Sequence, residues 1–328
     1  MCANSCLTAV VALAMTVGGI GSATAETWPA RPITMVIPFA AGSGIDVLGR
    51  ILAPAISEVI GQQVIVENIG GAGGMTGAAR VARAAPDGYQ FVLGNVGTHA
   101  HSQALYAKPL YNAVSDFTPV ALVADTPQVL ITRANFPADN LQTFVAYAKT
   151  NQAKLQFGSP GAGSAAHLGC VLLDTAIGIN VVHVPYRGGG GAMQDLLAGR
   201  IDYQCPLVAL AISQIESKAV KALAVLTRDR SSILPDVASA REQGLADFEL
   251  LTWNAFFLPK GTLAPIVEKL NRAAATAIDL PAVRERMKQV GAEAAAPQRR
   301  SPDYLQKLVE TEVAKWGPVI HAAGVTAE

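Results

Sequence analysis

The chain has 328 residues, of which 51% are hydrophobic and 15% charged, and its 25 basic and 25 acidic side chains give a net charge of zero. This length suits one large or two medium α/β domains with enough apolar material for a core. Nucleic acid is excluded as a partner, because binding it requires a basic face that neutralises phosphates.

The first 25 residues have the pattern of a secretory signal peptide. Residues 6–20, CLTAVVALAMTVGGI, form an uncharged apolar run, and Ala23 and Ala25 supply the small residues of an A-x-A cleavage site. The run is too short for a comfortable membrane span. We expect cleavage after about Ala25 and an exported mature protein. The segment before the run has no Lys or Arg, so the true translation start stays open.

From Trp28 onward, short apolar segments alternate with helical patterns. Strands are predicted at 33–39, 63–69, 90–95, 119–124, 128–133, 154–159, 180–186, 201–205, 221–227 and 252–258. Helices are predicted at 45–60, 74–84, 102–107, 141–150, 164–177, 191–199 and 209–218, and the chain is expected to be purely helical after residue 263. Several strands lack polar alternation, which favours parallel strands covered on both faces. The fold class is therefore α/β, built from repeated strand–loop–helix units.

Two extended segments, 119–133 and 221–258, separate two sets of these units. A chain that leaves one domain, builds a second and then returns needs two such crossings. We therefore expect lobe 1 to comprise residues 26–126 and 252–328, and lobe 2 to comprise residues 127–251.

Four strand-to-helix junctions are rich in glycine: 39–46, 68–78, 157–167 and 186–195. The first and third share a layout, with a Phe at the strand end, a Gly-Ser pair, a further Gly and then a helix. Glycine allows close backbone approach, and the first turn of a helix offers unpaired N–H groups. These two loops are predicted to hold an anion without Lys or Arg. The other two are interpreted as tight turns.

Other chemistry finds less support. Residues 161–166 fit G-x-G-x-x-A, but no acidic residue follows about 20 positions later, so no dinucleotide or other cofactor is expected. Ser43 and Ser164 are explained by helix capping, although Ser164 with His167 one turn later keeps a secreted Ser/His hydrolase as an alternative. His99 and His101 are interpreted as a solvent or cleft pair rather than half of a metal site, and no metal is expected.

Asp46 and the two later cysteines leave alternatives open. Asp46 lies in the first turn of a helix, where the dipole stabilises it, or it faces the ligand and accepts from a hydroxyl, amine or water. Cys170 and Cys205 are expected to be buried free thiols, with a disulfide possible in an oxidising compartment.

The chain after Ala25 resembles the Bug (Bordetella uptake gene) family of periplasmic substrate-binding receptors of tripartite tricarboxylate transporters. The resemblance begins at WPARPITMVIPFAAGSGID (28–46) and continues through GQQVIVENIGGAGGMTGAARVARAAPDGYQFVLGNVGTHA (61–100) and FGSPGAGSAAHL (157–168). It extends through HVPYRGGGGAMQDLLAGRIDY (183–203) to FFLPKGTLAPIVEKLN (256–271) and KWGPVIHAAG (315–324).

The resemblance implies a type II periplasmic-binding fold, in which two lobes, each with a central, mainly parallel sheet flanked by helices, close around a small carboxylate. It also implies a monomer that passes a mono- or dicarboxylate to membrane transporter subunits. The alternative is a ligand-sensing receptor that signals to a membrane histidine kinase. The implied ligand-binding residues are Phe39, Ala41, Gly42, Ser43, Asp46, Asn95, Gly97, Thr98, Ser159, Gly161, Ala162, Gly163, Ser164, His167 and Cys205.

The sequence departs from the family pattern at two places. Gly42-Ser43 replaces the usual Gly-Gly of the first loop, and IDYQCPLVALA (201–211) replaces polar cleft residues with Cys205 and Pro206. The identity of the carboxylate therefore stays open, and a longer or less polar ligand is indicated.

Overall fold

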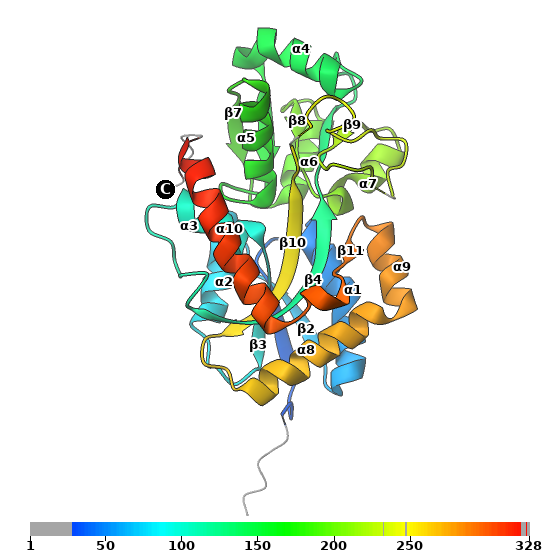
Figure 1. Ribbon diagram of the computed structural model, residues 1–328. Coiled ribbons are helices and arrows are strands. Elements are labelled where there is room, and N and C mark those ends of the chain that lie inside the picture. The colour runs from blue at the N-terminus through cyan, green and yellow to red at the C-terminus, as the bar shows by residue number, and fades with distance from the viewer. Residues whose placement is uncertain (1–27, 232, 247, 323–325, 327–328) are drawn as a thin grey trace, which may run out of the picture.

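In the computed structural model, which describes residues 28–231, 233–246, 248–322 and 326, the chain forms two lobes joined by two extended crossings (Figure 1). The predicted signal peptide lies outside these residues. Each lobe has its own sheet; the orders are β11-β4-β10-β3-β1-β2 in the first and β7-β6-β8-β5-β9 in the second. The two-lobed α/β class is confirmed.

The first lobe is built around the six-stranded sheet. Its strands are β1 (Ile33–Ile37), β2 (Val64–Asn68), β3 (Gln90–Asn95), β4 (Phe117–Pro127), β10 (Leu251–Pro259) and β11 (Glu293–Ala294). Its helices are α1 (Gly44–Ile60), η1 (Ala72–Gly74), α2 (Met75–Ala82), η2 (Gly97–His101), α3 (Ser102–Leu105), α8 (Ala264–Asp279), α9 (Pro281–Gln289), η4 (Pro297–Arg299) and α10 (Pro302–Ala322).

The second lobe is built around the five-stranded sheet. Its strands are β5 (Val129–Arg133), β6 (Gln156–Ser159), β7 (Val182–Pro185), β8 (Tyr203–Gln204) and β9 (Val220–Val225). Its helices are α4 (Leu141–Asn151), η3 (Gln152–Lys154), α5 (Ala165–Ile177), α6 (Gly189–Leu197) and α7 (Val208–Glu216).

Both faces of each sheet are covered, which explains the missing polar alternation in strands such as β1. Met35 and Ile37 of β1 pack into the core beneath α1 and α8, whereas Val36 faces the core beneath α2 and α10. A strand buried on both faces gains from an apolar residue at every position. The described helices include none that is long and apolar enough to cross a membrane.

The sheets are mixed, which corrects the prediction that they are mainly parallel. β1 pairs in parallel with β2 and β3, but β10 is antiparallel to both β3 and β4. In the second sheet β5 is antiparallel to β8 and β9. The cause is the double crossing: β4 carries the chain out of the first lobe and β10 carries it back, so that neighbouring strands run in opposite directions. β11 also interrupts the stretch expected to be purely helical.

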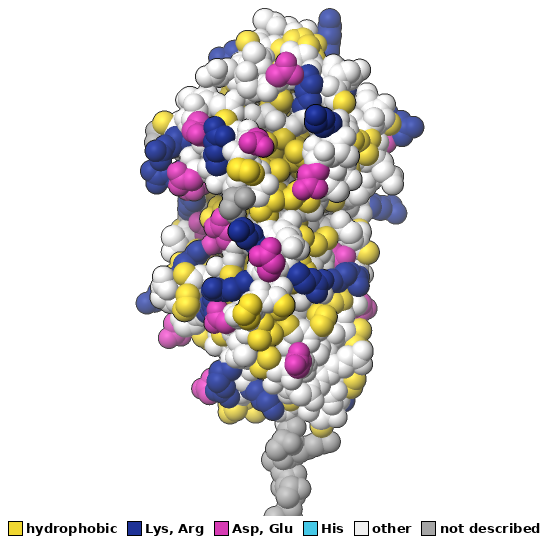
Figure 2. All heavy atoms as spheres, turned by 90° about the vertical axis from the view of Figure 1, so that its right-hand side faces the viewer, with side chains coloured by type: hydrophobic (Ala, Val, Ile, Leu, Met, Phe, Trp, Pro, Cys, Tyr) yellow, Lys and Arg dark blue, Asp and Glu magenta, His cyan; other side chains and the backbone are white. Residues whose placement is uncertain are grey.

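The surface over α7 and α9 carries no large field of one sign. Figure 2 shows basic, acidic and hydrophobic side chains interspersed over this side of the molecule. This side of the molecule therefore lacks the clustered positive charge to which nucleic acid binds.

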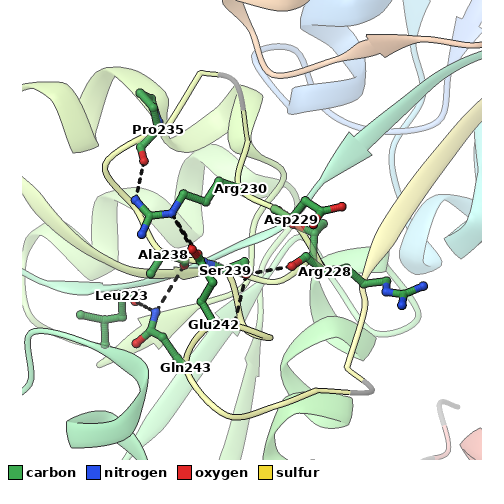
Figure 3. A network of polar contacts seen from close by, with 10 residues as sticks. Leu223, Arg228, Asp229, Arg230, Pro235, Ala238, Ser239, Glu242 and Gln243 are labelled. Carbon is green, nitrogen blue, oxygen red and sulfur yellow. Dashed lines mark hydrogen bonds and ion pairs between the residues drawn. The ribbon is translucent and has the colours of Figure 1, made fainter.

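The long return from β9 to β10 is held by a local polar network rather than by regular structure (Figure 3). Arg230 pairs with Glu242 at 2.9 Å, and the Ser239 hydroxyl donates to the carbonyl of Arg228 at 2.9 Å. Gln243 donates from Nε2 to the carbonyl of Leu223 at 2.8 Å. Backbone groups that would otherwise lack partners are thereby satisfied, and the second crossing has a defined path.

At the first crossing, Gln128 joins the two lobes. It lies between β4 and β5, and its Nε2 donates to the carbonyl of Ala165, the first residue of α5, at 3.0 Å. The same nitrogen donates to the Thr252 hydroxyl of β10 at 3.0 Å. The start of α5 is therefore tied to both crossing strands.

Candidate functional site

The two loops with the shared layout, 39–46 and 157–167, lie on opposite lobes and border one pocket; we call them the serine loops. The pocket has a volume of about 40 Å³. Its lining residues are Phe39, Ser43, Gly44, Ile45, Asn95, Pro160, Ser164, Ala165, Ala166, Gly189, Gln204, Pro206, Leu207 and Leu210. None of them carries a charge.

The serine loop of the first lobe ends in the N-cap of α1. Ser43 has extended backbone angles, and its Oγ accepts from the amide of Asp46. Gly42 adopts a φ of +78°, a left-handed conformation that favours glycine, and its amide donates to Asp46 Oδ2 at 2.8 Å. The loop is therefore folded back onto its own helix, and Ser43 keeps its hydroxyl proton available to donate.

Asp46 braces this loop. Besides Gly42, its carboxylate accepts from Arg50 Nε at 3.0 Å and from Asn68 Nδ2 at 2.8 Å. Burial raises the pKa of Asp46, but the hydrogen bonds from Arg50, Gly42 and Asn68 outweigh burial and lower that pKa below its usual value. Asp46 does not line the pocket, so the structure favours the bracing role over contact with a ligand.

The serine loop of the second lobe repeats this arrangement at α5. Ser164 caps the helix by accepting from the amide of His167 at 3.2 Å. The amide of Gly163 donates to His167 Nδ1 at 3.1 Å, and the amide of Gly161 donates to Ser159 Oγ at 3.1 Å. Like the Ser43 hydroxyl, that of Ser164 remains available as a donor at the mouth of its helix.

The same contacts explain why Ser164 and His167 do not form a hydrolytic pair. His167 Nδ1 already accepts from a backbone amide. Burial, with smaller contributions from His183 and His101, lowers the pKa of His167 to about 3, so its ring is neutral. A general base must reach the hydroxyl proton that it removes, whereas Ser164 bonds to the backbone of His167.

The lobes touch across the crevice. Tyr106 of the first lobe donates from its hydroxyl to the carbonyl of Ala162 at 2.9 Å. A Cβ placed on Gly73 would lie 2.1 Å from that same carbonyl oxygen, and one placed on Gly97 would lie 3.0 Å from the amide of Ala165. The described conformation is closed, and the pocket is small because the lobes meet around it.

Asn95 and Gln204 bring side-chain amides to the pocket from opposite lobes. Asn95 Oδ1 accepts from the amide of Thr98 at 3.1 Å, and Thr98 Oγ1 accepts from the amide of Asn95 at 2.9 Å. This exchange fixes Asn95 and leaves its amide nitrogen free to donate. Gln204 is 2% exposed, and its Nε2 has no hydrogen-bond partner among the described residues.

The predicted site residues divide by position. Four line the pocket directly: Phe39, Ser43, Asn95 and Ser164. The others on the two serine loops and the 95–98 turn surround the pocket without lining it: Ala41, Gly42, Asp46, Gly97, Thr98, Ser159, Gly161, Ala162, Gly163 and His167. The structure adds Gln204, Leu207 and Leu210, for which the sequence has no specific signal.

Cys205 lies elsewhere, in a disulfide with Cys170. The Cα atoms are 5.4 Å apart and both residues are fully buried in the core around α4 and α5. The expectation of two free thiols is therefore wrong, because β8 brings Cys205 directly beneath α5. Its sulfur is bonded and faces away from the pocket, so we do not keep Cys205 in the proposed site.

The interpretation of His99 and His101 as a solvent or cleft pair is wrong, because both side chains are buried. His99 is fully buried and stacks on Phe257 with ring centroids 3.8 Å apart, and His101 meets Trp316 edge-on at 4.9 Å. Burial lowers the pKa of each to about 3. Among the residues that the structure describes, no group of three or more His, Cys, Asp or Glu could hold a metal ion.

Comparison with known proteins agrees with this geometry. A family profile described as "Tripartite tricarboxylate transporter family receptor" matches residues 48–325. A UPF0065 protein of Agrobacterium vitis, from the TAR-I ttuE-ttuC' intergenic region, is 40% identical over 299 residues, which cover 91% of this chain and 86% of that protein. The structure of the periplasmic binding protein BugD is 38% identical, with a TM-score of 0.87, and the match covers 92% of this chain and 100% of that one. MatC from Rhodopseudomonas palustris, solved with bound malate, is 38% identical with a TM-score of 0.86, covering 89% and 100%.

Proposed function

This chain belongs to the Bug-type receptor family of tripartite tricarboxylate transporters, and from that premise we propose that it binds a small organic carboxylate between its lobes in the periplasm and delivers it to a membrane transporter. Members of this family are substrate-binding proteins rather than enzymes, so the hydrolase alternative is excluded. MatC, with its bound malate, supports a carboxylate as the ligand class.

One observation carries the proposal: two helix N-termini from opposite lobes open onto one uncharged pocket. Ser43 is the N-cap of α1 and Ser164 is the N-cap of α5, and both line that pocket. Helix N-termini attract anions through their unpaired amides and positive potential. A carboxylate held between them would draw on both lobes, so that binding and closure are the same event.

The energy available suits a receptor that must also release its ligand. A hydrogen bond to a charged group contributes roughly 1.5–3 kcal/mol, and a helix terminus adds about 0.3–1 kcal/mol. Two or three such donors from each lobe can provide the roughly 8 kcal/mol of a micromolar complex after association costs.

We propose the domain boundaries and the export step on the same basis. Lobe 1 comprises residues 26–126 and 252–328, and lobe 2 comprises residues 127–251. Opening then occurs where β4 passes into β5 and where the 226–250 segment returns to β10. Residues 1–25 act as the signal peptide, and the receptor works as a monomer.

A thermal-shift screen with a broad panel of organic acids at millimolar concentration tests the proposal. A ligand with a micromolar dissociation constant, present at about a thousandfold excess over that constant, stabilises the folded state by about 4 kcal/mol. We expect at least one acid to raise the melting temperature by several degrees. A panel in which no acid changes the melting temperature would reject carboxylate binding.

A pair of variants at Ser164 locates the site. Asp and Asn both replace Ser well at an N-cap, so Ser164→Asp and Ser164→Asn should both keep α5 intact. Only Ser164→Asp places a negative charge at the helix mouth, and it should abolish carboxylate binding while Ser164→Asn retains most of it. Equal affinities in the two variants would place the carboxylate elsewhere.

A receptor that delivers its ligand to a transporter and one that signals ligand binding to a sensor kinase would use the same cleft. Crosslinking of the liganded receptor to membranes, followed by identification of the attached protein, separates the two. Recovery of the transporter subunits supports the proposal, and recovery of a kinase ectodomain alone replaces it with sensing.

A further inference from the structure

The pocket has a second half, distinct from the two serine loops, and it is apolar. Pro160, Pro206, Leu207 and Leu210 line it from the second lobe, and Ile45 faces it from the first. Leu207 and Leu210 are partly exposed, although Leu210 also packs against the core beneath α6 and α7. The part of a ligand that extends beyond the carboxylate must lie against these side chains.

This apolar wall also covers the other helix starts that border the pocket. A Cβ placed on Gly189, the first residue of α6, would lie 2.5 Å from Leu210 Cδ2, and one on Gly188 would lie 2.8 Å from Ala40 Cβ. α7 has Leu207 as its N-cap, without a side-chain cap. Neither α6 nor α7 therefore presents the open, hydroxyl-capped mouth that α1 and α5 present.

Gln204 is the exception on this side of the pocket. Its Nε2 is buried without a hydrogen-bond partner among the described residues, and a buried donor of this kind is costly unless an acceptor reaches it. The residue lines the pocket, so a ligand oxygen or a bound water would satisfy it. One neutral acceptor matches one amide donor, whereas a second carboxylate would need several donors or a cation.

We propose that this receptor selects short monocarboxylates whose tail is uncharged and largely apolar, carrying at most one neutral oxygen acceptor for Gln204. The inference rests on the proposed carboxylate function and narrows it. Leu207 and Leu210 are the specificity-determining residues: they exclude a second carboxylate by covering the surfaces that could bind it.

A matched set of five-carbon acids tests the inference: pentanoate, 4-oxopentanoate and glutarate, measured by calorimetry on the full mature chain. They share one carboxylate and differ at the far end, which is a methyl group, a methyl ketone or a second carboxylate. We expect the two monocarboxylates to bind at least about tenfold tighter than glutarate, a difference of about 1.4 kcal/mol. Glutarate binding as tightly as pentanoate would overturn the inference and leave the carboxylate function standing. Failure of every acid in this set and in the broader panel would overturn both.

Leu210→Ser tests the covering residue, with Leu197→Ser as its control. Leu210→Ser uncovers the start of α6 and should reduce the preference for pentanoate over glutarate by about tenfold or more. Leu197 is 46% exposed and does not line the pocket, so Leu197→Ser should keep the preference. An unchanged preference in a folded Leu210→Ser protein would overturn the role of Leu210.

Gln204→Leu tests the single donor. The variant should weaken 4-oxopentanoate by about tenfold, because the ketone loses its donor, and should leave pentanoate within about twofold. An equal loss for both acids would show that Gln204 supports the fold rather than the ligand, and would overturn that part of the inference.

Discussion

Replacing Gly73 with Ala should prevent full closure of the lobes. Gly73 belongs to η1 in the first lobe, and its Cβ would lie 2.1 Å from the carbonyl oxygen of Ala162 in the second. Ordinary contact begins at 3.4 Å, so the two backbones must separate by about 1.3 Å at this point. The Cβ position is fixed by the backbone and the carbonyl oxygen is main chain, so no side-chain rotation can relieve the overlap.

That separation is large compared with the reach of a hydrogen bond. A donor at about 2.9 Å moves to about 4.2 Å, beyond any useful hydrogen bond. A ligand held between the serine loops then loses the donors of one loop. Two hydrogen bonds to a carboxylate, at roughly 1.5–3 kcal/mol each, correspond to an affinity loss of about 10²–10⁴-fold.

The matched control is Gly61→Ala. Gly61 has a φ of +79° and Gly73 a φ of +61°, so Ala is strained at both positions by about 1–2 kcal/mol. A Cβ on Gly61, however, meets nothing within 4 Å. Calorimetry with the best acid from the panel should show weak binding in Gly73→Ala and near-normal binding in Gly61→Ala. Equal affinities in the two would show that the closed contact between Gly73 and Ala162 is not needed for binding.

Two further predictions concern stability. A disulfide that closes a loop of 35 residues stabilises the folded protein by about 4 kcal/mol if it acts through the entropy of the unfolded chain. Reducing Cys170–Cys205 should therefore lower the urea midpoint clearly. Two free thiols in the denatured, unreduced mature protein would refute the bond. Three buried histidines, the half-buried His183 and the buried Asp174 should make stability depend on pH. Burial lowers the pKa of His99, His101 and His167 to about 3 and that of His183 to about 4, and it raises the pKa of Asp174 to about 8. On unfolding near pH 5 the four histidines take up a proton each and Asp174 releases one, so unfolding takes up about three protons. The contribution of the neutral histidines to stability is complete above pH 6.5 and is lost as the pH falls toward 4. Equal urea midpoints at pH 7 and pH 5 would contradict neutral histidine rings in the folded protein.

Much of the fold could be predicted because the local signals are strong. The apolar strand before Phe39, the small-residue turn and Ser43 as a cap all agree on a strand followed by a helix, and the same combination recurs at Ser164. Strand direction could not be predicted, because a buried strand has the same apolar pattern in either direction. The antiparallel position of β10 follows from the chain's return between lobes, which depends on contacts distant in sequence.

The sequence indicates the residues around the pocket where helix caps and glycine turns place them, and it does not indicate those that side-chain packing places there. The sequence indicates Cys205 for the site, whereas its neighbour Gln204 lines the pocket. Successive residues of a strand point to opposite faces, and the sequence does not show which face meets the pocket. Leu207 and Leu210 have the spacing of an ordinary core helix. The burial of His99 could not be predicted from its neighbours in sequence, because it depends on stacking against Phe257, which is distant in the chain.

The Cys170–Cys205 bond has a consequence for biogenesis. Cytosolic thiols stay reduced, so under the proposed export step the precursor lacks this cross-link in the cytosol and its folded state is less stable there. Oxidation then links α5, whose N-cap is Ser164, to the end of β8, which carries Gln204. Under the proposed export, the wall of the second lobe therefore gains its covalent link only outside the cytosol.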